Sequence, residues 1–197
     1  MTRPFIHSVL CVLLLMLSVS VHADGDPVPG KPHLTLLHIR HYDRDGNVVT
    51  GQLVCNKAIA QDLVDIFREL YKAQYRIERM ETTEHYGNDD ERSMEANNTS
   101  CYNYRTMTGS SKLSMHARGL AIDINPLYNP YVKGSTVRPA KGRRYATGRT
   151  AANEPWHGAF ITKGSLVYRL FKKHGFTWGG EWRSCKDYQH FEKKVTR

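Results

Sequence analysis

The segment that most constrains the fold of this chain is 114–123, which reads SMHARGLAID. His116 stands just before a glycine turn, and residues 120–124 alternate like a strand that carries Asp123 on one face. An imidazole and a carboxylate held in this way can bind one zinc ion, whose ligands lie at about 2.0 to 2.2 Å. A catalytic zinc site needs a third protein ligand, so the fold must bring a distant segment beside this strand.

Two later segments offer the third ligand, and each has an acid followed three residues later by a histidine. The first is Glu154-Pro155-Trp156-His157 and the second is Asp187-Tyr188-Gln189-His190. The second follows a Gly-Gly turn in a strand-like run, where a sheet would hold the ligand more accurately than a loop. We therefore favour His190 as the third ligand and keep His157 as the alternative.

The 197 residues fit one domain behind an export signal. Residues 1–23 contain Arg3, a short apolar run and small residues before Ala23, which is the layout of a secretory signal peptide. The apolar run is shorter than the roughly 20 residues that cross a bilayer, so we expect no stable membrane insertion after cleavage. We predict an exported protein, periplasmic or secreted, with a flexible leader at 24–32 and a single domain at 33–197.

Hydrophobic periodicity predicts a mixture of helices and strands, which is an α+β fold. Asn56 is a suitable N-cap for a helix to about residue 74, and Ser165 begins a second helix that ends at Gly175. A turn at 43–47 joins the first two predicted strands, and the segment 127–163 lacks a sustained period, which is typical of a long functional loop. The predicted strands are 33–42, 48–54, 75–80, 101–105, 120–124 and a last one within 176–192.

The net charge of +9 has one main source, a run without acidic residues that we call the basic segment, 133–149. It contains Lys133, Arg138, Lys141, Arg143, Arg144 and Arg149. Basic excess suggests an anionic partner. A nucleic acid is not expected, because the segment lacks a pattern of interleaved aromatic residues, with Tyr145 alone among its basic residues, and has no known binding module.

The combined motifs carry a resemblance. Ser-x-His-x-x-Gly-x-Ala-x-Asp at 114–123, followed by Asp-x-x-His at 187–190, resembles the VanY-type D-alanyl-D-alanine carboxypeptidase and L-alanyl-D-glutamate endopeptidase family of zinc peptidases. Residues 103–105, 112–117, 121–126 and 187–191 are also similar to that family, and the likeness extends from about residue 56 to 192.

The resemblance implies a small α+β domain with a zinc site on an antiparallel sheet. It implies that His116, Asp123 and His190 are the zinc ligands, that Asp187 is the catalytic carboxylate and that Arg105 faces the substrate. Ser114 is expected to hydrogen-bond within the site or to substrate. Many relatives have glutamate where this chain has Asp187, and Glu154 or Glu181 is the alternative acid. If Arg105 and Asp187 share a cleft, the nearby Cys101 and Cys185 are expected to form a disulfide.

We therefore expect a monomeric zinc metallopeptidase that hydrolyses peptide bonds in peptidoglycan stem peptides, as a carboxypeptidase or an endopeptidase. In this role Asp187 would be the general base and acid for a zinc-bound water. The alternative is a non-catalytic zinc-containing binding module of the cell envelope, because the vertebrate Hedgehog signalling domain is similar in fold and zinc site but serves as a ligand. Under the peptidase hypothesis, the basic segment is expected to be a lid that recruits the acidic wall peptide. Neutralising Arg143 and Arg144 would test this role.

Overall fold

A long antiparallel hairpin begins the computed structural model, which describes residues 25–107 and 110–195. Strands β2 (Leu34–Tyr42) and β3 (Val48–Asn56) pair along their full length, from Leu34 opposite Asn56 to Tyr42 opposite Val48. The carboxylate of Asp43 accepts hydrogen bonds from the backbone N–H groups of Asp45 and Asn47, which closes the turn. The predicted hairpin turn is confirmed.

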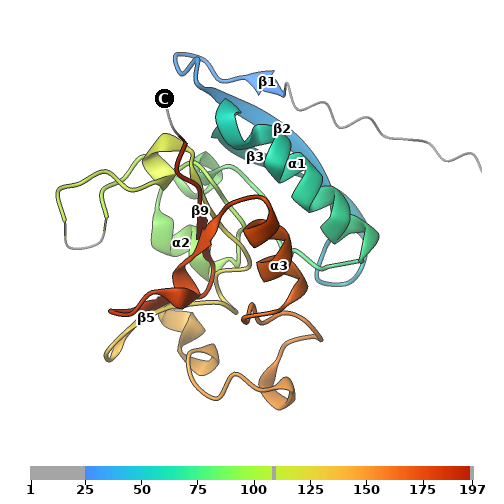
Figure 1. Ribbon diagram of the computed structural model, residues 1–197, viewed down its shortest axis with the longest axis vertical. Helices are drawn as coiled ribbons and strands as arrows, with labels where there is room; N and C mark the ends of the chain where they lie inside the picture. The colour runs from blue at the N-terminus through green and yellow to red at the C-terminus, as the bar shows by residue number, and fades with distance from the viewer. Residues whose placement is uncertain (1–24, 108–109, 196–197) are drawn as a thin grey trace, which may run out of the picture.

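Helix α1 (Lys57–Lys72) follows the hairpin directly and lies along it (Figure 1). Its N-cap is Asn56, whose side chain accepts a hydrogen bond from the backbone N–H of Ala58, as predicted. The predicted apolar stripe of the helix is buried, since each member is at most 2% exposed: Ile59, Leu63, Ile66, Phe67 and Leu70. Burial of this stripe against β2 builds one side of the core.

The second sheet joins distant parts of the chain in the order β4-β9-β7. Strand β4 spans Ala121–Asp123, β7 spans Thr177–Trp178 and β9 spans His190–Glu192. Helix α3 (Leu166–Lys173), capped by Ser165 as predicted, packs against this sheet through Phe171, whose ring stacks on Phe191 at 4.3 Å. The core therefore lies between α1, α3 and the two sheets.

The segment 127–163 is more regular than its sequence suggests. It contains β5 (Tyr131–Lys133), β6 (Thr136–Arg138) and 3₁₀ helices at Ala140–Tyr145 and Ala151–Asn153. Strand β8 (Lys186–Asp187) joins the β5-β6 hairpin in a third sheet, ordered β6-β5-β8. The long segment is thus tied to the C-terminal strands instead of forming a free loop.

Two predicted strands, 75–80 and 101–105, are wrong. The first has only isolated bridges, Arg76 with Tyr42 and Arg79 with Asn98, and the second is flanked by the bridges of Ser100 with Asp123 and Thr106 with Leu113. Asparagine side chains take the place of a neighbouring strand. Asn125 accepts from the backbone N–H of Glu78, and Asn98 accepts from that of Glu81. The predicted short helix in 81–98 is present as α2 (Asp90–Glu95), preceded by a 3₁₀ turn at Thr83–Tyr86.

The N-terminal predictions fall only partly on described residues. The predicted signal peptide at 1–23 lies outside them. Within the leader at 24–32, β1 (Asp26–Pro27) pairs with β2, so this part is an edge strand and not the flexible chain that we expected. Pairing gives the backbone of Asp26 a partner, and its carboxylate lies 2.9 Å from Nε2 of His38. Among the described residues, no helix has both the length and the apolar character needed to cross a bilayer.

Candidate active site

His116, Asp123 and His190 meet at one end of the second sheet. His116 opens a 3₁₀ turn, His116–Arg118, which ends at Gly119 with a φ of 66°. A Cβ at Gly119 would lie 2.7 Å from the backbone nitrogen of Asn56, so only glycine fits this tight turn into β4. Asp123 ends β4 and is directly opposite His190 of β9. His190, which the sequence favoured as the third ligand, therefore lies on the strand that neighbours Asp123.

The facing atoms of these three side chains have the spacing of metal ligands. Nε2 of His116 lies 3.1 Å from Nδ1 of His190 and 3.3 Å from Oδ2 of Asp123, and His190 Nδ1 lies 3.1 Å from Asp123 Oδ1. Ligands about 2.0 to 2.2 Å from a common tetrahedral centre would be about 3.3 to 3.6 Å apart. All three residues are buried, and a metal ion fits among them.

The outer nitrogens of both histidines have partners that accept hydrogen bonds. Nδ1 of His116 donates to the carbonyl oxygen of Cys101 at 2.7 Å, and Nε2 of His190 donates to the carboxylate of Glu192 at 3.2 Å. Each bond places the N–H on the outer nitrogen and turns the other nitrogen inward, as in metal-binding histidines. Glu192 was not predicted, although its position two residues after His190 places both on one strand face.

Charge at this cluster favours a cation. Burial alone would raise the pKa of Asp123, but His116 and His190 hold it well below its usual value. Burial would lower the pKa of His190, yet hydrogen bonds to Asp123 and Glu192 raise it to about 10. The cluster therefore keeps an ionised carboxylate and binds positive charge at neutral pH, which is the electrostatic requirement for holding a divalent metal.

Asp187 stands in β8, whose backbone pairs with β5 so that Asp187 is opposite Tyr131. Burial raises the pKa of Asp187 to about 6, and Asp123 acts in the same direction, while His190 opposes it. A carboxyl group with this pKa exchanges protons near neutral pH, which suits a general base and acid. Gly179 allows the close packing of this strand, because an added Cβ there would lie 2.7 Å from the Cβ of Asp187.

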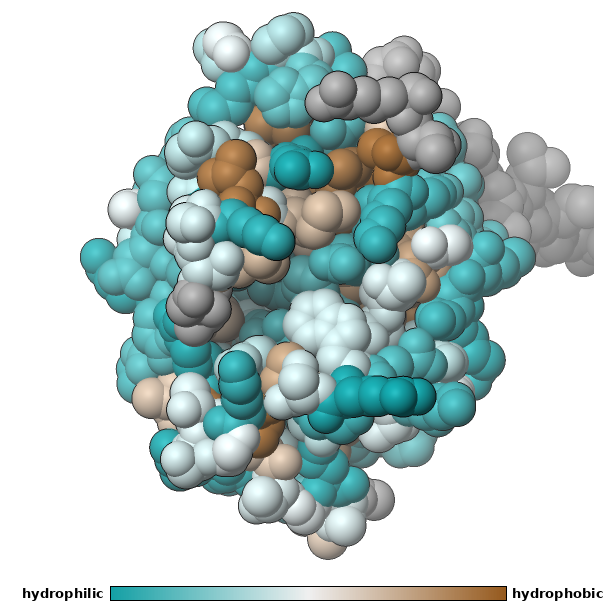
Figure 2. Space-filling view, turned by 60° about the vertical axis from the view of Figure 1, so that its left-hand side comes forward, coloured by the Kyte–Doolittle hydropathy of each residue, from teal (hydrophilic) through white to brown (hydrophobic). Residues whose placement is uncertain are grey.

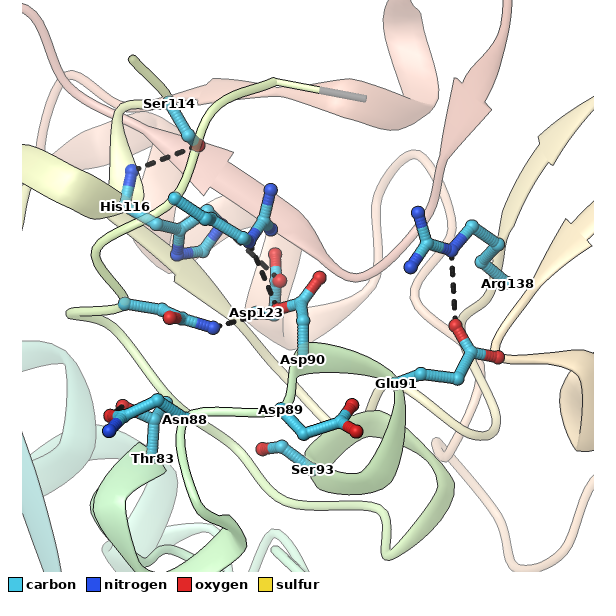
Figure 3. Close-up of polar contacts among 12 residues, drawn as sticks. Thr83, Asn88, Asp89, Asp90, Glu91, Ser93, Ser114, His116, Asp123 and Arg138 are labelled. Atoms are coloured by element: carbon cyan, nitrogen blue, oxygen red, sulfur yellow. Dashed lines mark hydrogen bonds and ion pairs between the residues drawn. The ribbon is translucent and has the colours of Figure 1, made fainter. Parts of the chain in front are cut away.

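Arg105 and Ser114 lie beside the first histidine. The backbone N–H of Ser114 donates to the carbonyl of Arg105, and Oγ of Ser114 accepts from the backbone N–H of His116. Nε of Arg105 lies 3.1 Å from the Asp90 carboxylate, and the side chain remains 27% exposed. The next residue, Glu91, pairs with Arg138 at 3.0 Å (Figure 3). The first turn of α2 thus holds two arginines.

One cleft of about 210 Å³ joins these groups. Its lining includes residues of α2, β5 and β9. Figure 2, in which the left-hand side of Figure 1 is turned forward, shows a central hollow with polar residues in it and apolar residues above. All six predicted site residues line it: Arg105, Ser114, His116, Asp123, Asp187 and His190. The other lining residues, which the sequence analysis did not name as site residues, are Asp90, Met94, Met107, Met115, Tyr131, Arg138, Trp182, Cys185, Gln189 and Glu192.

The alternative site residues lie elsewhere in the described structure. Glu154 and His157 line a separate cavity of about 620 Å³, where Glu154 accepts from the backbone N–H of Phe160. Glu181 pairs with Lys172 and accepts from the hydroxyl of Tyr168. The second sheet therefore brings His190, and the third sheet brings Asp187, into the cleft of His116 and Asp123, while these alternatives lie elsewhere.

The predicted Cys101–Cys185 disulfide is wrong, because both cysteines and Cys55 are free thiols. Cys101 is buried behind His116, and its thiol donates to the carbonyl of Gly119 at 3.3 Å. Cys185 instead lines the cleft. Burial raises the pKa of the Cys101 thiol well above its usual value, which makes this thiol unreactive.

The basic segment is folded against α2. Lys141 pairs with Glu95 and Arg138 with Glu91, while Nη1 of Arg143 donates to the carbonyl of Ser135. Of the six basic residues, Arg138 lines the cleft. The expected mobile lid is instead a hairpin and a 3₁₀ helix with defined contacts.

Comparison with known proteins bears on the region that carries the site. Residues 108–193 match the family model described as D-alanyl-D-alanine carboxypeptidase, which covers less than half of the chain but includes His116, Asp123, Asp187 and His190. No curated protein and no solved structure gives a significant match. The match agrees with the arrangement of the cleft and with the motifs in the sequence. Over residues 108–193, the chain is therefore similar to the D-alanyl-D-alanine carboxypeptidase family of peptidases, in agreement with the VanY-type resemblance of its motifs.

Proposed function

We propose that this protein is an exported zinc peptidase that hydrolyses peptide bonds in the stem peptides of peptidoglycan. The observation that carries the proposal is the placement of Asp187 and Arg105 in one cleft with three inward-facing metal-ligand side chains. Export to the cell envelope is supported by the signal-like residues 1–23. A cell-wall peptide as the substrate agrees with the D-alanyl-D-alanine carboxypeptidase model that residues 108–193 match.

His116, Asp123 and His190 would hold the zinc ion. When bound, zinc supplies a Lewis acid that lowers the pKa of a water towards about 7. Two neutral imidazoles and one carboxylate suit this role, because they leave net positive charge at the ion. Glu192 and the carbonyl of Cys101 keep both imidazoles oriented.

Asp187 and Arg105 would act on the substrate from the walls of the cleft. Asp187 would accept a proton from the attacking water and return it to the leaving amine, for which a pKa of about 6 is suitable. The guanidinium of Arg105 would donate hydrogen bonds to the oxyanion or to a substrate carboxylate. The carboxylate of Asp90 holds this guanidinium in place at 3.1 Å. The position of the Asp187 carboxyl group in the cleft favours an enzyme over a binding module.

The proposal is tested by incubating the purified protein with muropeptides, with and without added zinc, and analysing the products by mass spectrometry. We expect zinc-dependent cleavage within the stem peptide. Loss of a terminal alanine would identify a carboxypeptidase, and internal cleavage would identify an endopeptidase. Unchanged muropeptides at full zinc occupancy would contradict the proposal and favour the non-catalytic module.

Replacement of Gly179 by alanine is expected to reduce both stability and hydrolysis. The new Cβ would lie 2.7 Å from the Cβ and carbonyl oxygen of Asp187 and 3.3 Å from the Cβ of His190. Overpacking of this kind costs about 1 to 3 kcal/mol and would move Asp187 away from its position. Thermal unfolding and muropeptide turnover measure the two effects.

Gly134→Ala is the matched control. Gly134 has a φ of +56° and open space where a Cβ would be, so the substitution strains the backbone by about 1 to 2 kcal/mol without touching the cleft. It should lower stability while the turnover of the folded protein stays unchanged. Full turnover by Gly179→Ala would show that the close approach of Gly179 to Asp187 is not needed.

A further inference from the structure

Arg149 ends the basic segment, but its side chain is partly buried, and it lines the cavity of Glu154 and His157. Nη1 donates to the carbonyl oxygens of Tyr128 and Tyr145 at 2.8 and 3.0 Å. Nη2 donates to Oδ1 of Asn129 at 2.7 Å and to the carbonyl oxygen of Ile161 at 3.4 Å. Burial lowers the pKa of Arg149 to about 10, so the group is still charged at neutral pH. A partly buried cation with these bonds joins three parts of the 127–163 segment.

The same guanidinium contacts the strand region that carries Asp187. Its Cζ lies 4.3 Å from the ring centroid of Phe160 and also 4.3 Å from that of Tyr188. Contacts of a guanidinium with an aromatic face are attractive, and more so away from water. Tyr188 directly follows Asp187, so Arg149 holds the residue at which the chain passes from β8 towards β9.

Asp187 depends on its neighbours for its direction. Its Oδ1 is buried and has no hydrogen-bond partner among the described residues. The backbone of β8 is fixed on one side by pairing with β5. After Asp187, the carbonyl of Tyr188 accepts from Nε1 of Trp178 at 2.9 Å, and the Tyr188 ring lies against Arg149. Apart from a side-chain hydrogen bond with Gln189, the position of the carboxylate is therefore set by the backbone on both sides of it.

We propose that Arg149 is a positioning residue for Asp187, acting through the ring of Tyr188. This inference rests on the proposed peptidase function. Rotation of Tyr188 would turn the adjacent backbone and move the Asp187 carboxylate within the cleft. His190 is held separately, by pairing with Asp123 and by Glu192, so the metal ligands should not move with it. The long segment would then support catalysis from behind the cleft.

The test separates positioning from general stability by comparing the two rings that Arg149 contacts. Arg149→Lys keeps the charge but loses the planar group, and it should lower kcat about tenfold to a hundredfold while KM and zinc content stay at the wild-type values. Phe160→Leu removes the ring that is not next to Asp187, and it should lower the melting temperature with kcat within about twofold. Equal losses of kcat in these two variants would overturn the proposal.

Substitutions of Tyr188 test whether Arg149 acts on Asp187 through the ring of Tyr188. Tyr188→Phe keeps the ring and should retain turnover, whereas Tyr188→Leu should lower kcat as Arg149→Lys does. Combining Arg149→Lys with Tyr188→Leu should add little further loss, because both act on one contact. Fully additive losses, or loss of zinc together with kcat, would show that Arg149 does not act through Tyr188 on Asp187.

Crystal structures of the wild type and Arg149→Lys give a readout that needs no activity. We expect the Asp187 carboxylate to be displaced and the three metal-ligand side chains to be unmoved. An unmoved Asp187 would overturn the inference. If the wild type hydrolyses no muropeptide, the proposed function fails, but these structures still decide whether Arg149 positions Asp187.

Discussion

Replacing His190 by alanine should remove bound zinc and abolish muropeptide hydrolysis. His190 supplies one of three inward-facing ligand atoms, at 3.1 Å from both Nε2 of His116 and Oδ1 of Asp123. Changes in the outer partners of metal ligands already reduce affinity about 10- to 100-fold, so loss of a ligand should exceed that range. Zinc content by elemental analysis and affinity by competition with a chromophoric chelator measure the effect.

His157→Ala is the control for this prediction. His157 was the alternative ligand in the sequence, and it is exposed at a separate cavity. Its removal should leave zinc content and hydrolysis at the wild-type level. The metal site described here would be contradicted if His157→Ala lost zinc or if His190→Ala kept it with unchanged affinity.

Replacing Asp187 by alanine should lower kcat by about 10²- to 10⁴-fold, the contribution of a positioned general acid or base. The carboxyl group lines the cleft, and its pKa of about 6 suits proton exchange near neutrality. It is not among the three inward-facing ligands, so zinc content should remain at the wild-type value. Turnover of muropeptides and zinc content, measured on the same preparation, check both parts.

Glu181→Gln provides the comparison, because Glu181 was an alternative acid in the sequence. Its carboxylate is occupied by Lys172 and Tyr168 on the surface. We expect this variant to keep its turnover. Retained turnover in Asp187→Ala, or a matching loss in Glu181→Gln, would assign the proton transfer to a different group.

Local patterns were sufficient for the elements that depend on neighbouring residues. The turn closed by Asp43, the N-caps Asn56 and Ser165, and the apolar stripe of α1 each involve contacts within a few residues or one helix face. Such contacts are visible in the order of residue types. The strand predicted at 75–80 was wrong because the side chain of Asn125, distant in sequence, binds the backbone groups of Arg76 and Glu78 that a strand partner would otherwise bind. The strand predicted at 101–105 was also wrong, since the backbone N–H groups of Tyr102 and Asn103 bond to separate segments, at Val54 and His116.

In the candidate site, too, residue order predicted some features, and contacts between distant segments decided others. Motif spacing and family resemblance named all six predicted residues that line the cleft. They did not indicate Glu192 as the partner of His190, nor the carbonyl of Cys101 as that of His116. Every residue has a backbone carbonyl, so the type of a residue does not show which carbonyl will accept a hydrogen bond from a histidine. The cysteine prediction failed because closeness in sequence to two cleft residues does not place two thiols within bonding distance.

By itself, the sequence determined which side chains are the candidates for the chemistry, because ligand type, the glycine turn and the acid three residues before His190 are properties of residue order. Only the tertiary structure decided how they meet. The pairing of β4 with β9 places Asp123 opposite His190 and leaves His157 at another cavity. The tertiary structure also decided where the last basic residue lies. The side chain of Arg149 is held because oxygens from four residues and two aromatic rings converge on its guanidinium. Long-range convergence of this kind depends on how strands pair, which local residue order does not encode.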